Sequence, residues 1–180
     1  MIIGMDHKGF TIIELIIIIT VMGILFVLGT VNLNGSQANA RDAERKTDVE
    51  TISLHLESYY KSGDDNSTVL GRYPSTILVS SVDKMKRMLR DIDVKSITAP
   101  GATLPTDTFK ASTNNIQTIA GVLPQPDKNQ YIYQPIQSDG SLCTLETQEC
   151  RKFNIYYKLE TATTECPGPN NICMVTSKNQ

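Results

Sequence analysis

The stretch FTIIELIIIITVMGILFVLGTVNL, from Phe10 to Leu33, decides the fold of this chain. Its length of about 24 residues corresponds to roughly 36 Å of α-helix, which is enough to cross a hydrocarbon core of about 30 Å. The many β-branched residues would suit a strand in a soluble protein. In lipid, however, every backbone polar group must be satisfied within the segment, and this favours a helix. The sequence therefore predicts a transmembrane helix over residues 10–33, called the stem below.

Charge is distributed unevenly along the 180 residues. Nearly every charged side chain lies from Arg41 onward, so an apolar stem precedes a polar head, residues 63–180. The net charge of −2 and the 20% of charged residues give no global excess that would indicate a nucleic-acid or anionic-membrane partner. Lys8 precedes the stem, and the positive-inside tendency then places the N-terminus in the cytoplasm and the head outside.

All four cysteines lie in the last third of the chain. Cys143 and Cys150 form one closely spaced pair, and Cys166 and Cys173 form another. Four cysteines allow three disulfide connectivities; the two local pairings are favoured because short loops close at small entropic cost. A zinc site is the competing interpretation, but its ligands are usually two to four residues apart and the two histidines are distant in sequence. Disulfides are favoured and indicate an oxidising, extracytoplasmic compartment.

Glu14 is the one charged residue inside the stem. A carboxylate within a membrane span costs about 2.5–3.5 kcal/mol on insertion scales, so it normally has a partner or a function. Lys8 lies more than one helical turn away. Two interpretations remain open on this residue alone: a cationic partner from another chain, or a carboxyl group that stays protonated near the membrane interface.

The flanking run KGFTIIEL, Lys8 to Leu15, resembles the processing site of class III signal peptides, which are found on type IV pilins and type II secretion pseudopilins. The resemblance implies that a prepilin peptidase removes a leader, residues 1–9, by cutting between Gly9 and Phe10. The same enzyme would methylate the new N-terminus at Phe10. Glu14 would then be the fifth mature residue, which is the characteristic acidic position of that family.

This processing would also supply a partner for Glu14. Cleavage creates a cationic α-amine at Phe10, which can approach Glu14 of a neighbouring subunit in a staggered filament and fix its register. The resemblance further implies assembly with copies of the same chain and other pilins, helped by a platform membrane protein and a cytoplasmic ATPase. An ordinary secretory cut after Ala40 is disfavoured, because secretory apolar regions are only about 7–15 residues long.

The helix is predicted to continue through residues 34–62, because no proline occurs before Pro74. Asp42 and Lys46, four residues apart, are expected to form an exposed ion pair. An apolar stripe at heptad spacing marks the face that would pack on the head: Val49, Ile52, Leu56 and Tyr59.

The head is predicted to contain one short helix followed by antiparallel strands. Met85, Met88 and neighbouring apolar residues share a helical face, with Ser81 or Asp83 as the cap. Strands are expected at residues 131–133, 153–160 and 172–176, with a turn at residues 138–141 and one exposed face on the central strand. The predicted fold class is α+β and pilin-like: a long N-terminal helix packed against a C-terminal antiparallel sheet.

The sequence offers no catalytic constellation, phosphate loop or metal-ligand cluster, so neither an enzyme, a cofactor nor a metal is predicted. His55 stands alone in a helical segment. Asp64, Asp65 and the stretch around Asp107 are too sparse for a committed calcium loop. A basic helical face could bind DNA, although a solvated face is the favoured interpretation; its residues are Lys84, Lys86, Arg87 and Arg90.

The predicted function is that of a major or minor type IV pilin, first anchored in the cytoplasmic membrane by one span and then assembled into an extracellular filament for adhesion, twitching motility or DNA uptake. One alternative is a pseudopilin of a type II secretion system. Another, from a different class, is a monomeric single-span surface binding protein.

Overall fold

The longest element is helix α1, which runs from Ile12 to Ser62. The structure is a computed structural model that describes residues 9–63, 70–166 and 169–179. The chain divides into two compact units, Met1–Ala38 and Asn39–Gln180, and α1 contributes residues to both. Helix α1 ends where Gly63 adopts a left-handed φ of 67° and its N–H donates to the Tyr59 carbonyl at 2.7 Å. Glycine reaches this conformation without steric cost, which makes it a favoured C-terminal cap.

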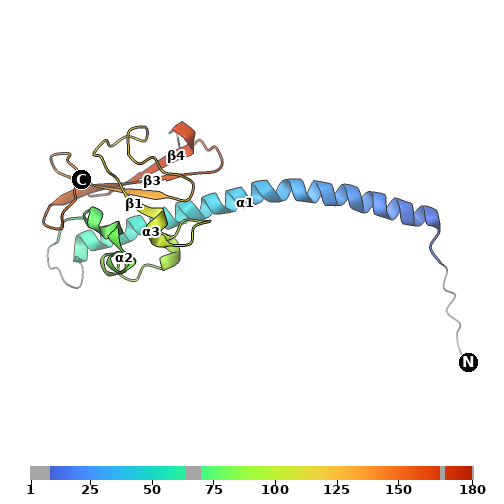
Figure 1. The fold of residues 1–180 in the computed structure, drawn as a ribbon, viewed down its shortest axis with the longest axis horizontal. Coiled ribbons are helices and arrows are strands. Elements are labelled where there is room, and N and C mark those ends of the chain that lie inside the picture. The colour runs from blue at the N-terminus through green and yellow to red at the C-terminus, as the bar shows by residue number, and fades with distance from the viewer. Residues whose placement is uncertain (1–8, 64–69, 167–168, 180) are drawn as a thin grey trace, which may run out of the picture. The chain divides into compact units, whose positions relative to one another are not determined.

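The second unit is an α+β arrangement built on a four-stranded sheet in the order β1-β2-β3-β4 (Figure 1). Strands β2 to β4 are antiparallel, as predicted. The sheet as a whole is mixed, because a short additional strand, β1, pairs with β2 in parallel. Three residues carry no usable periodicity, and this is why the sequence did not reveal β1. The strands are β1 Phe109–Ala111, β2 Tyr131–Gln137, β3 Cys150–Lys158 and β4 Ile172–Thr176.

One face of the sheet packs on residues 49–59 of α1 and forms the main hydrophobic core. The apolar stripe predicted on the helix supplies its part of this core, since all four side chains are at most 6% exposed. Alternate residues of the strands point to the same side, as the two-residue period of a strand requires. The sheet contributes Phe109, Tyr131, Tyr133, Phe153, Ile155 and Tyr157.

The opposite face of the sheet is also buried, which corrects the prediction of an exposed face on β3. Asn154 and Tyr156 are at most 6% exposed. Tyr156 and Asn154 donate to the Gln134 side-chain oxygen at 3.0 and 3.1 Å, and the Gln134 amide donates to the carbonyls of residues 114 and 116. The loop over residues 112–125 therefore covers this face, and Gln134 satisfies the polar groups of the cover. A small second core lies beneath it: Val122, Ile132, Tyr156 and Ile172.

Short helical elements fill the segment between α1 and the sheet. Helix α2, Val82–Met88, is preceded by Ser81, whose hydroxyl accepts from the Lys84 N–H at 3.3 Å. Ser81 is thus the cap, and Asp83 lies inside the first turn. Met85 and Met88 are buried as predicted. The other short helices of this segment are η1 Thr76–Ser80, η2 Val94–Ile97 and α3 Pro105–Thr108. A further short helix, η3 Pro169–Asn171, lies between β3 and β4.

A buried polar cluster joins α1 to the segment after β3. Asp42 accepts from the backbone N–H groups of Glu160 and Thr161 at 2.8 and 2.9 Å. Arg45, only 1% exposed, donates to Asp42, to Glu160 and to the Lys128 carbonyl at 2.7–2.8 Å. The predicted Asp42–Lys46 pair was wrong, because Asp42 turns into this cluster and Lys46 instead pairs with Glu165.

The cluster favours the ionised form of both its carboxyl groups. The hydrogen bond from Arg41, assisted by Arg45, lowers the pKa of Glu160 to about 2 against the desolvating effect of burial. Burial disfavours ionisation of Asp42, but hydrogen bonds from Thr161, the Glu160 N–H and Arg45 together outweigh it and lower the pKa. Both groups therefore stabilise the fold above their ordinary pKa range. The contribution of Glu160 is lost as pH falls through about 2, and that of Asp42 is lost as pH falls through its own lowered pKa.

Asp48 has the opposite tendency. Its side chain is 5% exposed and accepts from the Tyr131 hydroxyl at 2.8 Å. Burial raises the pKa of Asp48 from 3.8 to about 6; the Tyr131 hydrogen bond lowers it, and nearby Glu44 raises it further. The folded state therefore prefers the protonated carboxyl. Its stabilising contribution is complete below the ordinary pKa and is lost as pH rises through about 6.

Asp48→Asn is therefore expected to stabilise the protein at pH 8. Asn keeps an acceptor for Tyr131 but carries no buried charge, so we expect a gain of about 1–2 kcal/mol, allowing for partial solvent screening. Unfolding of the full chain in detergent, measured at pH 5 and pH 8, checks this. The variant should lose part of the pH dependence, whereas exposed Glu50→Gln should keep it. Equal pH slopes in the wild type and Asp48→Asn would contradict the assignment.

Candidate functional site

The N-terminal end of α1 carries the residues that the sequence singles out. Gly9 and Phe10 precede the helix and are exposed, and Ile12 is the first helical residue. Among the described residues, no atom outside the immediate neighbours lies within 4 Å of the position where a Gly9 side chain would begin. The Gly9–Phe10 peptide bond is thus in non-helical, uncovered backbone, which a peptidase can reach. Residues 1–8 of the expected leader lie outside the described residues.

Thr11 and Glu14 form a capping box at the start of α1. The Thr11 N–H and the Thr11 hydroxyl both donate to Glu14 Oε2 at 2.8 Å, and the Glu14 N–H lies 3.3 Å from the Thr11 hydroxyl oxygen. A Thr followed three residues later by Glu, ahead of an apolar run, is the sequence signature of this motif. The arrangement satisfies backbone donors that a helix start otherwise leaves open.

The capping box gives Glu14 a hydrogen-bond partner within its own chain. Sequence reasoning considered a partner from another chain or a protonated carboxyl and missed Thr11, although the Thr-x-x-Glu spacing is a recognisable signal. Within the described residues both hydrogen bonds end on Oε2, and none reaches Oε1. One oxygen is therefore engaged inside the chain, and the other is open to a second donor. The contact with the α-amine of a neighbouring subunit stays a prediction.

The first part of α1 exposes a continuous apolar surface. Among the described residues, one helical segment, Ile12–Gly29, is long and apolar enough to cross a membrane, and none of it is buried within the chain. Phe26 is 74% exposed and Ile12 is 80% exposed. A soluble monomer rarely presents a contiguous apolar surface of this extent, so the segment requires lipid or other protein around it.

Two disulfides lie at the ends of β3 and β4. Cys143 pairs with Cys150, the first residue of β3, and Cys166 pairs with Cys173 within β4. These are the two local pairings. All four cysteines are at most 6% exposed, and the described residues contain no free cysteine. The bridges close short loops and limit the freedom of the unfolded chain.

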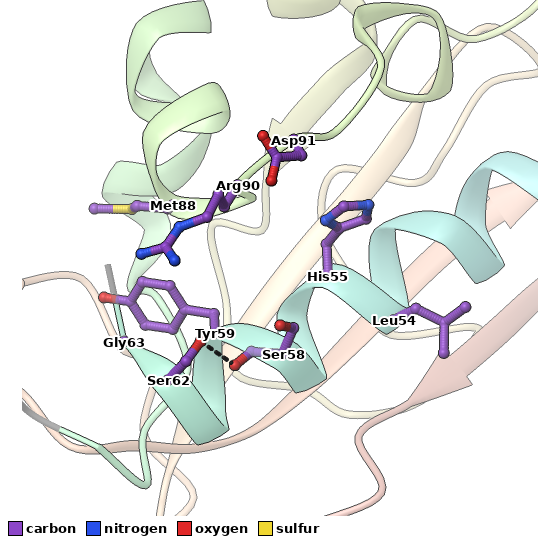
Figure 2. A pocket seen from close by; sticks show the side chains of 9 residues that line it. All are labelled: Leu54, His55, Ser58, Tyr59, Ser62, Gly63, Met88, Arg90 and Asp91. Carbon is purple, nitrogen blue, oxygen red and sulfur yellow. Dashed lines mark hydrogen bonds between the residues drawn. The ribbon is translucent and has the colours of Figure 1, made fainter. Parts of the chain in front are cut away.

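An open pocket near the end of α1 contains His55 (Figure 2). Figure 2 shows the Arg90 side chain extending beside Tyr59, with His55 and Asp91 at the other end of the pocket. Ser62 donates to the Ser58 carbonyl at 2.9 Å, but within the described residues no hydrogen bond joins His55 to Ser58 or Asp91. The pocket thus holds no assembled nucleophile and base.

Among the described residues, the remaining candidate sites form no metal cluster, and the basic face is partly paired with a carboxylate. Within the described ranges there is no group of three or more His, Cys, Asp or Glu residues that could hold a metal. Asp64 and Asp65 lie outside the described residues, and Asp107 sits in α3. On the basic face, Lys84 and Arg87 approach Glu146 at 3.8 and 4.0 Å, which offsets part of the positive charge.

Comparisons with known proteins agree with the N-terminal features. The family described as the prokaryotic N-terminal methylation motif matches residues 4–30. A protein of Myxococcus xanthus (strain DK1622), the type IV major pilin protein PilA, is 25% identical over 119 residues, or 61% of this chain. The match covers 53% of that protein, so the chain spans about half the length of the relative it matches. No solved structure matches the chain.

Proposed function

We propose that this chain, a type IV pilin-like protein by its N-terminal methylation motif, is a structural subunit that polymerises through its apolar stem into a surface filament. It is a filament-forming protein and not an enzyme. The observation that carries the proposal is the exposed, uninterrupted apolar helix Ile12–Gly29 with a single carboxylate, Glu14, in its first turn. This helix needs an apolar environment, which lipid supplies before assembly and neighbouring stems supply afterwards.

The proposed pathway begins with a precursor spanning the cytoplasmic membrane once, with its N-terminus inside and its head outside. A prepilin peptidase cuts after Gly9 and methylates Phe10, and Thr11 and Glu14 both remain in the mature chain. The capping box therefore survives processing and holds Glu14 at the helix start. The buried disulfides support an oxidising location for the head.

In the filament, the new α-amine at Phe10 pairs with Glu14 of a neighbouring copy. Pairing removes two charges from an apolar environment and specifies one axial register, as buried polar residues do in coiled coils. The partners we propose are copies of this chain, other pilins, the prepilin peptidase, a platform protein and an assembly ATPase. We propose a type IV pilus as the filament, and a type II secretion pseudopilin stays the alternative. The exposed heads would then serve adhesion, motility or DNA uptake.

The deciding experiment is the intact mass and N-terminal peptide sequence of the protein from membranes and from sheared surface material. We expect a terminus at Phe10 that carries one extra methyl group, in both fractions. A terminus at Met1 in cells that possess the peptidase would make the stem an ordinary anchor and contradict the proposal. A cut after Ala40 would identify a secretory signal instead, although Ala40 lies inside α1.

A further inference from the structure

The C-terminal tail, Ser177–Asn179, continues the sheet beyond β4. The Ser177 N–H donates to the Phe153 carbonyl at 2.9 Å, and the Ser177 hydroxyl accepts from the Phe153 N–H at 3.3 Å. Strand β4 lies at the edge of the sheet and pairs with β3 alone. Edge strands have neighbours on one side only, so they open more readily than central strands.

Glu57 of α1 holds this tail. Its side chain is 7% exposed. Glu57 Oε1 accepts from the Lys178 N–H at 2.7 Å, and Oε2 accepts from the Asn179 side-chain amide at 2.6 Å. The Tyr73 hydroxyl adds a third bond to Oε2 at 3.0 Å. The carboxylate is thus held by neutral donors, and none of the described basic residues forms an ion pair with it.

The arrangement couples the tail to α1 in both directions. A buried carboxylate is tolerated only where hydrogen bonds replace its hydration. Two of the three donors to Glu57 come from the tail, so release of the tail would leave the charge with Tyr73 alone. Conversely, loss of the Glu57 charge removes the charge-assisted bonds, which are about twice as strong as neutral ones, that hold the tail.

We propose that residues 177–179 form a clasp, which Glu57 holds in place through its hydrogen bonds. The clasp keeps the edge strand β4 paired with β3. The Cys166–Cys173 disulfide restrains the first half of β4 covalently. The second half, Met174–Thr176, has no such bridge and depends on the clasp. The extracellular head is thereby closed at both ends of its last strand. This inference concerns the head alone and does not rest on filament assembly.

Hydrogen exchange of the full chain in detergent micelles tests the clasp, with Glu57→Gln as the variant. Gln has nearly the same shape, but one of the two Glu57 oxygens becomes an NH2 group. This group is a donor and cannot accept a hydrogen bond from the Lys178 N–H or the Asn179 amide. We expect protection of the amides at residues 174–178 to fall by about tenfold or more, with β2 much less affected. Glu50→Gln, an exposed charge removal on the same helix, should leave protection unchanged. Equal behaviour of the two variants, or a uniform loss across the sheet, would overturn the proposal.

A truncation provides an independent measurement. Ending the chain at Ser177 should speed exchange in β4 to a similar degree as Glu57→Gln. In the truncated chain, the further change Glu57→Gln should have little additional effect, because the donors it disrupts are already gone. Additive effects of the two changes would show that Glu57 and the tail act separately, and the clasp would then be rejected.

Discussion

Glu14→Leu is expected to leave the protein in the membrane and to reduce the amount of sheared surface filament by about a hundredfold or more. The change makes the stem more apolar, so membrane insertion should not suffer. In the proposed filament, however, it would leave the α-amine of each neighbouring Phe10 without the anionic partner that we propose. Breaking one side of a buried ion pair costs about 3–5 kcal/mol, and the loss is repeated at every subunit interface. Quantitative blotting of membrane and sheared fractions measures both effects.

Two further variants separate the charge of Glu14 from its role in the capping box. Glu14→Gln retains an oxygen that can accept from Thr11 but lacks the charge, and Thr11→Val retains the charge but lacks the hydroxyl that donates to Glu14. If the pair with the α-amine drives assembly, Glu14→Gln should be nearly as defective as Glu14→Leu, and Thr11→Val should assemble substantially better. A wild-type yield of filament from Glu14→Leu would contradict any role of Glu14 in assembly.

Arg45→Met is expected to give the largest loss of stability among single changes in the second unit, Asn39–Gln180. Met fills much of the space but leaves the buried Asp42 carboxylate without its cationic partner and the Lys128 carbonyl without its donor. Removing one partner of a buried ion pair costs about 3–5 kcal/mol. Thermal unfolding of the full chain in detergent, with the disulfides intact, measures the shift.

Arg41→Met is the matched control for this prediction. Arg41 also donates to Glu160, at 2.6 and 2.7 Å, but its side chain is 38% exposed, so water can replace it. We expect a far smaller loss of stability. Comparable losses for the two variants would mean that burial of Arg45 is not what makes the cluster important. An Arg45→Met protein of normal stability would contradict a stabilising role for the cluster.

Local patterns determined much of the architecture. The length and composition of residues 10–33 predict an apolar helix without reference to the rest of the chain, because a helix satisfies its own backbone polar groups. The heptad spacing from Val49 to Tyr59 predicts the face that is buried against the sheet, since helical periodicity is a local property. The KGFTIIEL run likewise indicates the processing signal. The Thr-x-x-Glu spacing in the same run is sufficient to predict the capping box.

Only the tertiary structure decided which polar residues are buried. Asp42, Arg45, Asp48 and Glu57 all read as ordinary charged residues on a helix, and each is at most 7% exposed. Their partners are Glu160, Tyr131 and the tail after β4, which lie more than 80 residues away in the chain. The parallel pairing of β1 and the loop that covers Tyr156 are equally non-local. Periodicity along one segment reports which of its sides is apolar, but the partner of a buried charge exists only once distant segments have been brought together.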